Sequence, residues 1–343
     1  MNRADDRLPE RRGSVLYAGA AYLTRVLARL TGGRFTPPTG GSLPPFPEML
    51  RFVEAGGKLP DMPLAEQLAL DPTFRAVTIE DVSIAGPNGA TPARSYRPAG
   101  EARAGFVWIH GGAFIGGDLD SPEAHWLSLS LAAQGIAVLS LEYRKAIRGV
   151  HYPVPFEDCL AGWDWAVAHC VDTLGVAATE LSLGGASAGG NLAAAVAKRV
   201  RDRGDGIRPK SIVLAYPWLH AQAVPWPPDE FAKARADAGG VFFELEDLTA
   251  MSHHYVGRRS LLSDPYAFPP NGDLSDLPPT LIVTAEYDSI RVSGEAFADA
   301  LAVASGNVTL VMDHGVGHAI IATPRNPAAR VSAQRISDWL LQG

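Results

Sequence analysis

Short apolar runs alternate with longer amphipathic stretches along most of the chain. The apolar runs predict strands, and the stretches with apolar residues three or four positions apart predict helices. The predicted strands are Val77–Ala85, Ala93–Arg97, Gly105–Ile109, Ile136–Leu141, Leu181–Leu183, Ser211–Ala215, Thr280–Thr284 and Val308–Val311. The predicted helices are Phe46–Glu54, Pro122–Ala133, Phe156–His169, Asn191–Arg203, Gly294–Ala304 and Ala328–Leu341. This alternation favours an α/β fold with a doubly wound, mostly parallel sheet of these eight strands.

The first two predicted strands differ from the others because only a turn joins them. The turn is Gly86-Pro87-Asn88-Gly89, a run of residues that turns prefer. Parallel neighbours need a crossover long enough for a helix, and none fits here. We therefore expect the first two strands to pair antiparallel.

Residues 217–279 interrupt the alternation of strands and helices. They are rich in proline and aromatic residues and hold helix-like stretches, but no clear strand. A long insertion between two strands usually passes over the sheet surface, so we expect it to form a lid with the N-terminal segment. The predicted organisation is an N-terminal cap segment at 1–75, a core at 76–217, a cap insertion at 218–275, and the rest of the core at 276–343.

Residues 14–30 carry apolar side chains at helical spacing, which predicts an amphipathic helix. A helix packed on the protein's own surface is the first interpretation. A helix that lies on a membrane surface is the alternative, supported only by Arg25 and Arg29.

Composition narrows the classes of partner. The chain has 343 residues, with 30 Lys and Arg against 37 Asp and Glu, so its net charge is −7. This acidic balance argues against a nucleic-acid partner. No apolar stretch reaches the ~18 residues that a transmembrane helix needs, so no integral membrane segment is expected.

The two cysteines bear on the compartment. Cys159 and Cys170 fall eleven positions apart in one predicted helix. At ~1.5 Å per residue their Cα atoms would lie about 16 Å apart, whereas a disulfide needs less than about 7 Å. Separate thiols fit a reducing compartment. The first residues mix acids and bases and lack a signal-peptide pattern, so we expect a cytoplasmic protein.

The first candidate catalytic motif is Gly185-Ala186-Ser187-Ala188-Gly189, which lies between a predicted strand and a predicted helix. A sharp turn there would expose the Ser187 hydroxyl and force an unfavourable backbone at the serine, which small neighbours tolerate. The same turn would place the Ala188 amide at a helix N-terminus, where it could bind an oxyanion. Ser187 is therefore the predicted nucleophile of an acyl-transfer hydrolase.

A serine hydroxyl needs a base, and the base needs an orienting acid. In a doubly wound sheet these groups belong at the carboxyl ends of strands. Asp288 follows one such strand and His318 another, in the chain order that the α/β-hydrolase arrangement requires. Glu286 and His314 compete for the same roles. We favour Asp288 because it lies later in its loop, and His318 because it has more chain with which to reach the nucleophile.

A second motif, His110-Gly111-Gly112-Ala113-Phe114, directly follows a predicted strand. A glycine-rich turn at this place can direct backbone N–H groups at a developing negative charge. The alternative interpretation is a tight turn with packing glycines.

These motifs, taken in order, resemble the hormone-sensitive-lipase-like branch of α/β-hydrolase esterases, the acetyl-hydrolase and carboxylesterase type. The matching residues are His110-Gly111-Gly112, Tyr143-Arg144, Ser187-Ala188-Gly189-Gly190-Asn191, Tyr216-Pro217, Asp264-Pro265-Tyr266, Leu277-Pro278-Pro279, Ala285-Glu286-Tyr287-Asp288 and Gly315 to His318. The resemblance spans residues 75–325. It implies a helical cap built from the N-terminal segment and the insertion, with oxyanion donors at the Gly111, Gly112 and Ala188 amides. Homodimers through the sheet edge are common in this family.

The chain departs from the family pattern at several positions. Ala113 replaces a glycine, Ala186 replaces an acidic residue or threonine, and Ala319 replaces the glycine after the histidine. Lys145 stands where the family has leucine, and Ser289 replaces a proline. None of these changes removes a member of the predicted triad, so they bear on substrate profile and local rigidity.

The sequence therefore predicts a serine hydrolase that acts on small or medium carboxylic esters, with Ser187, His318 and Asp288 as its triad. Phe114, Trp218 and Phe243 are candidate walls of the substrate pocket. No metal or organic cofactor is required, and His253-His254 lacks the surrounding ligands of a metal site. The alternatives are a non-catalytic ligand receptor on the same fold, an amidase and a lactonase.

Overall fold

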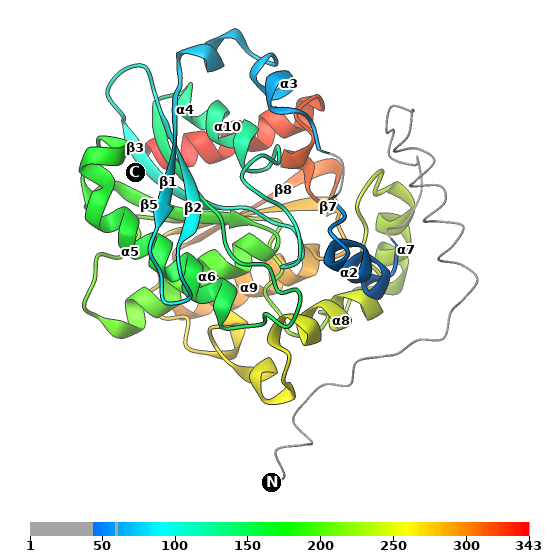
Figure 1. Ribbon diagram of the computed structural model, residues 1–343. Helices are drawn as coiled ribbons and strands as arrows, with labels where there is room; N and C mark the ends of the chain where they lie inside the picture. Colours follow the sequence, from blue (N-terminus) through cyan, green and yellow to red (C-terminus); the bar gives the residue numbers. More distant parts are fainter. Residues whose placement is uncertain (1–43, 59–60, 343) are drawn as a thin grey trace.

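The computed structural model describes residues 44–58 and 61–342. An eight-stranded sheet forms its centre, in the order β1-β2-β4-β3-β5-β6-β7-β8 (Figure 1). The strands are β1 (Thr78–Ile84), β2 (Thr91–Arg97), β3 (Ala104–Ile109), β4 (Ile136–Leu141), β5 (Leu181–Ala186), β6 (Ile212–Ala215), β7 (Thr280–Tyr287) and β8 (Val308–Gly317). β2 pairs antiparallel with β1 and with β4, and the other pairs are parallel. The predicted sheet and its antiparallel start are confirmed.

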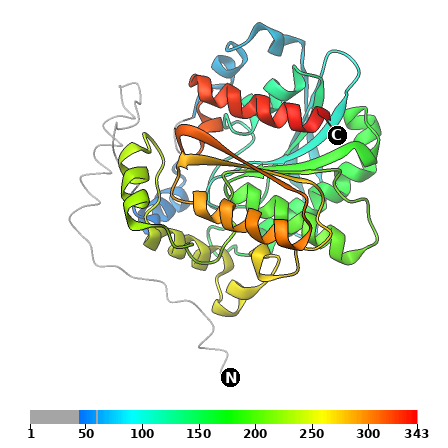
Figure 2. The same cartoon turned by 180° about the vertical axis from the view of Figure 1, so that it is seen from behind.

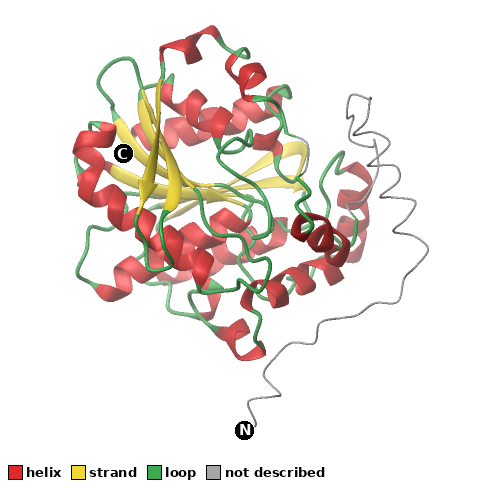
Figure 3. Cartoon of the chain, viewed as in Figure 1, coloured by secondary structure: helices red, strands yellow, loops and turns green. Residues whose placement is uncertain are grey.

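Helices cover both faces of the sheet (Figures 2 and 3). α4 (His125–Ala132) and α10 (Pro327–Gln342) lie on one face; α5 (Val154–Leu174), α6 (Ala188–Arg203) and α9 (Arg291–Ala304) lie on the other. Successive strand residues point to opposite faces. In β3, Phe106 and Trp108 therefore join the core under α4 and α10, while Val107 and Ile109 join the core under α5 and α6.

The observed elements run further than the sequence predicted at the ends that matter for chemistry. β5 continues through two glycines to Ala186, because β3 and β6 bond it on both sides. This pairing overrides the weak strand propensity of glycine. α6 begins at Ala188, three residues earlier than predicted. β8 extends to Gly317, so the predicted loop before His318 is strand.

The insertion between β6 and β7 contacts the sheet through α7 (Pro228–Asp237), which packs on β7 and β8. It also contains α8 (Leu245–Val256) and the 3-10 helices η3 (Arg259–Ser263) and η4 (Pro269–Asn271), and it contributes no strand to the sheet. α2 (Phe46–Glu54), at its predicted bounds, packs on α8, and the Phe46 amide donates to Asp247 Oδ1 at 2.8 Å. Shorter helices complete the fold: α3 (Leu64–Leu68), η1 (Pro72–Ala76), η2 (Ala178–Glu180) and η5 (Ile320–Ala322).

Three other sequence expectations concern single segments. The amphipathic helix predicted at residues 14–30 lies outside the described residues. Cys159 and Cys170 are both buried on α5 and unpaired, as predicted. Within residues 44–58 and 61–342, no helix combines the length and apolar character needed to cross a bilayer.

Candidate active site

Ser187 occupies a sharp turn between β5 and α6. Its backbone has φ 52° and ψ −118°, a combination that non-glycine residues rarely adopt and that stores strain. The Ser187 amide donates to the Ala215 carbonyl at 2.9 Å, which anchors the turn to β6. A β-carbon at Gly185 would overlap the carbonyl of Gly189. The small residues around Ser187 therefore permit the turn, as the sequence predicted.

Three side chains from separate strand ends meet at this turn. Ser187 Oγ lies 3.0 Å from His318 Nε2, and His318 Nδ1 lies 2.7 Å from Asp288 Oδ2. All three residues are buried, and the Ile290 amide donates to the other oxygen of Asp288 at 3.0 Å. The residues lie up to 131 positions apart in the chain. Only the parallel sheet brings them together, because it places the ends of β5, β7 and β8 at one edge.

The hydrogen bonds determine which nitrogen of His318 holds the proton. An ionised carboxylate only accepts, so His318 Nδ1 carries the hydrogen that it donates to Asp288. Nε2 is then free to accept from the Ser187 hydroxyl. Burial lowers the pKa of His318, but the charge of Asp288 and its hydrogen bond outweigh burial and raise that pKa above its usual value.

The competing residues Glu286 and His314 pair with each other at the surface. His314 Nδ1 lies 3.4 Å from Glu286 Oε2, which also accepts from the Gly315 amide at 2.9 Å. A shift in register between Ala285 and Tyr287 interrupts the alternation of β7. This irregularity separates the two acids, so Glu286 points outward while Asp288 is fully buried.

The glycine-rich turn after β3 lies against the nucleophile, but one of its amides is already bonded. The Gly111 N–H donates to Glu123 Oε2 at 2.5 Å, and the Tyr216 hydroxyl donates to Glu123 Oε1 at 2.7 Å. Within the described part of the chain, the amides of Gly112, Ala113 and Ala188 have no acceptor. Sequence reasoning missed Glu123, since nothing in its local pattern indicates a partner twelve residues earlier.

On the other side of the glycine-rich turn, the carbonyls of His110 and Gly111 accept hydrogen bonds from side chains. His110 Nδ1 donates to the Gly111 carbonyl at 2.7 Å, and the Tyr143 hydroxyl donates to the His110 carbonyl at 3.2 Å. In a trans peptide the C=O and N–H groups point in opposite directions. Holding the Gly111 carbonyl on one side therefore leaves the Gly112 N–H on the other.

Lys145, where the family pattern has leucine, adds a further support. Its ammonium pairs with Glu142 and lies 3.0 Å from His110 Nε2 and 3.9 Å from the centre of the Tyr143 ring. His110 Nε2 also lies 3.1 Å from Glu142 Oε1, so the lysine, the glutamate and the histidine form one polar cluster. Burial lowers the pKa of Lys145, while Glu142 opposes that effect.

The three candidate pocket residues are all buried, but they contact different parts. The Phe243 ring meets the His318 ring edge-on, with 5.4 Å between centres. Phe114 stacks on Tyr255 of α8 at 3.8 Å, and the Trp218 indole donates to Ser252 of α8 at 3.1 Å. Phe243 therefore borders His318, and Phe114 connects the core to α8. Trp218 contacts both α8 and the triad, because its amide also donates to the Ser187 carbonyl at 3.2 Å.

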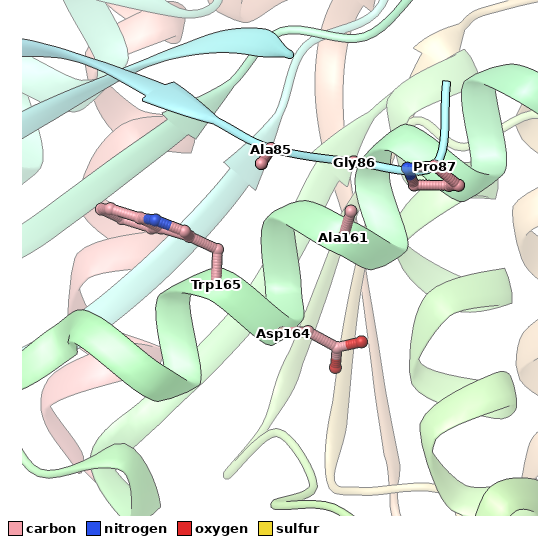
Figure 4. Close-up of a pocket in the computed structure, with 6 residues that line it drawn as sticks. All are labelled: Ala85, Gly86, Pro87, Ala161, Asp164 and Trp165. Carbon is pink, nitrogen blue, oxygen red and sulfur yellow. The ribbon is translucent and has the colours of Figure 1, made fainter. Parts of the chain in front are cut away.

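A hollow lies between α5 and the turn that follows β1 (Figure 4). It is open, and its lining is Ala85, Gly86, Pro87, Ala161, Asp164 and Trp165. Its one ionisable side chain, Asp164, is paired with Arg203. The hollow contains no nucleophile or base, and the triad takes no part in its lining. Among the described residues, no group of three or more His, Cys, Asp or Glu is arranged to hold a metal ion.

Comparisons with known proteins agree with the fold. The alpha/beta hydrolase fold family matches residues 106–322. Carboxylic ester hydrolase LipN of Mycobacterium tuberculosis is 35% identical over 243 residues, covering 68% of this chain and 62% of LipN. Esterase LipI of the same organism is 31% identical over 280 residues, covering 78% of this chain and 83% of LipI.

Solved structures give the same result. An esterase from Pyrobaculum calidifontis has a TM-score of 0.69 at 30% identity, covering 86% of this chain and 97% of that structure. The carboxylesterase EstE1, from a metagenomic library, has a TM-score of 0.69 at 28% identity, covering 87% and 97%. The family match extends over more than half of the chain, and this protein belongs to the hormone-sensitive-lipase-like carboxylic ester hydrolases of the alpha/beta hydrolase fold family.

Proposed function

We propose that this protein is a serine hydrolase that cleaves small to medium carboxylic esters through an acyl-enzyme. The supporting observation is the continuous path from Ser187 Oγ through His318 to Asp288, with distances of 3.0 and 2.7 Å. The orientation of His318 leaves Nε2 unprotonated beside the serine hydroxyl. This is the arrangement that general-base activation of a serine requires.

In the first half of the reaction Ser187 Oγ attacks the acyl carbonyl of the ester. His318 Nε2 takes the hydroxyl proton as the bond forms, and Asp288 stabilises the resulting imidazolium without taking its proton. His318 then gives that proton to the leaving alkoxide, and the acyl group stays on Ser187. In the second half His318 takes a proton from water as the water oxygen attacks the acyl carbon. His318 then returns that proton to Ser187 Oγ as the bond between that oxygen and the acyl group breaks, which releases the acid and restores the serine.

The tetrahedral oxyanion needs N–H donors that are free in the resting protein. The Gly111 amide, assigned to this role from the sequence, is bonded to Glu123. We therefore replace it with Ala113 and propose donors at Gly112, Ala113 and Ala188. Gly112 and Ala113 have φ of 119° and 55°, a left-handed path that turns successive amides toward one side of the loop. Glu123 positions this loop through Gly111.

The substrate pocket is proposed to lie beneath a cap made of residues 1–75 and 218–275. Its candidate walls, Phe114, Trp218 and Phe243, are large, apolar and buried, so they fit an uncharged acyl group. Among the relatives are an ethyl acetate hydrolase of Pseudomonas putida, 29% identical over 246 residues, and an arylesterase of Saccharolobus solfataricus, 29% identical over 279 residues. Their names are consistent with simple esters as substrates here.

A series of p-nitrophenyl esters tests this proposal. We expect kcat/KM to rise from the acetate ester by about 10-fold for each added methylene that the pocket can hold. It should fall once the acyl chain is longer than the pocket. Initial rates across the series measure the effect, with matched p-nitroanilides as the control that distinguishes an amidase. An absence of turnover with every ester would refute the function.

We also propose that the protein forms a homodimer through the β8 edge of the sheet. Within the described strands β8 pairs only with β7, and Leu310 on β8, Val303 on α9 and Val331 on α10 are exposed. An unpaired edge with apolar neighbours favours pairing with another chain.

Light scattering tests the dimer. The wild type should give twice the chain mass of 36.4 kDa, and Leu310→Lys should give the mass of a single chain. Val171→Lys is the control, because Val171 is an exposed apolar residue on α5, away from β8. A monomeric wild type contradicts the proposal.

A cytoplasmic location remains a proposal. It is supported by Cys159 and Cys170, which are both buried and unpaired as expected in a reducing compartment.

A further inference from the structure

Residues 226–243, here called the α7 segment, lie against the loops that carry Asp288 and His318. α7 contacts both β7 and β8 near their carboxyl ends (Figures 1 and 2). Trp226, Ala234, Ala238 and Phe242 form a separate hydrophobic cluster, and Tyr287 and Val292, on either side of Asp288, pack against it. The segment therefore has a core of its own, shared with the loop of the triad acid.

The residue after Asp288, Ser289, binds the α7 segment through its hydroxyl and its carbonyl. Ser289 is buried, and its Oγ accepts from the Phe243 amide at 3.0 Å. The Ser289 carbonyl accepts from the Trp226 indole at 3.1 Å. Both ends of the segment are thus bonded to one residue next to the triad acid.

The triad base contacts the same segment. Val241 and His318 form an antiparallel bridge, and the Phe243 ring packs edge-on against the imidazole. A β-carbon at Gly317 would overlap the Ala238 carbonyl, so glycine permits this close approach. The backbone of Gly317 and His318 therefore packs directly against the α7 segment.

Arg291 supplies a third attachment, just beyond Ser289. Its guanidinium lies 4.4 Å from the centre of the Trp226 ring and pairs with Glu230 of α7 at 2.8 Å. It also donates to the Glu286 carbonyl at 3.1 Å. The same side chain therefore connects the α7 segment to the strand that leads to Asp288.

We propose that the α7 segment is a fixed part of the catalytic machinery and that Ser289 is the positioning residue that joins it to Asp288 and His318. This inference rests on the proposed function. A lid that only admits substrate would not need bonds to both triad loops. A segment bonded to both defines the distance between acid and base, on which proton transfer depends.

Ser289→Ala tests this inference, because it removes the acceptor for the Phe243 amide and leaves the triad side chains intact. We expect kcat to fall about 10- to 100-fold, as a small misplacement of catalytic groups does, while KM changes less than about twofold. The second-order rate of labelling by a fluorophosphonate should fall by the same factor, since it also requires activation of Ser187.

The matched control is Ser293→Ala. Ser293 is buried four positions later, and its Oγ also accepts a backbone N–H at 3.0 Å, from Leu219 instead of the α7 segment. We expect the control to lose a comparable amount of thermal stability, with kcat within about twofold of wild type. If Ser289→Ala and Ser293→Ala lost the same amount of kcat, the effect of Ser289 would be explained by stability alone, and the inference would be overturned.

Trp226→Phe is the second variant, and it carries the test if Ser289→Ala does not fold. It keeps an aromatic ring beside Arg291 and removes the N–H that donates to the Ser289 carbonyl, together with part of the indole volume. It should also lower kcat and the labelling rate together, and wild-type values for both would overturn the inference. A wild-type protein that neither hydrolyses esters nor takes the label would instead refute the proposed function.

Discussion

We expect Ser187→Ala to lower kcat for p-nitrophenyl acetate by about 10⁶-fold, on the scale of nucleophile deletions in other serine hydrolases. The variant keeps the turn, since alanine is small, but it has no oxygen to attack the ester or to hold the acyl group. Any remaining turnover would come from water and the oxyanion donors. Steady-state rates on protein that passes a thermal-melt comparison with wild type measure the effect.

Covalent labelling distinguishes loss of the nucleophile from general damage. A fluorophosphonate should modify wild type at one position, with the added mass on the peptide that contains Ser187, and should leave Ser187→Ala unmodified. A label on another serine, or near-normal turnover by the variant, would contradict the assignment of the nucleophile. Absence of labelling in the wild type would favour the ligand-receptor alternative.

We expect Asp288→Asn to lower kcat near neutral pH by about 10⁴-fold, the size of this change in another Ser-His-Asp enzyme. The side chain keeps its shape, but an amide facing His318 can donate to Nδ1. The ring proton then moves to Nε2, which can no longer accept from Ser187. Rates at several pH values measure the effect.

The pH dependence of the wild type follows from the raised pKa of His318. The base acts only when neutral, so kcat/KM should rise with pH through that pKa, which lies above the ordinary value of 6.5. Burial lowers this pKa; the charge and hydrogen bond of Asp288, with a contribution from Glu123, raise it. Without the carboxylate the lowering effect of burial remains, so the midpoint in Asp288→Asn should move to lower pH.

Glu286→Gln is the matched control for this substitution. It changes the same kind of group two positions earlier, where the side chain is bonded at the surface to Gly315 and His314. Its kcat should stay within about twofold of wild type, as for most surface substitutions. A large loss in Glu286→Gln with little change in Asp288→Asn would reverse the assignment of the acid.

The sheet and its flanking helices were predictable because their signals are local. Apolar runs bounded by turns predicted all eight strands, and the Gly86–Gly89 turn predicted the antiparallel start. The ends of elements were less accurate. β5 passes through two glycines that favour no strand, since neighbours on both sides supply its hydrogen bonds.

The meeting of Ser187, Asp288 and His318 could also be predicted from the sequence, because each follows a strand and all carboxyl ends of a parallel sheet share one edge. The alternation of side chains along the strand could not decide whether Asp288 or Glu286 faces His318. Two residues on the same face of an extended strand are equivalent until a register shift separates them, and that shift arises from the pairing of β7 with β8.

By itself, the sequence determined the fold, the order of the chemical groups and the turn that presents Ser187, because these depend on spacing along the chain and on local backbone geometry. Only the tertiary structure shows that Glu123 accepts the hydrogen bond of the Gly111 amide. It also shows that Ser289 and Val241 join the α7 segment to the loops of Asp288 and His318. These contacts join residues from 12 to 77 positions apart, the longest between Val241 and His318. Such contacts depend on which surfaces meet when the core packs, and no periodicity in the sequence records them.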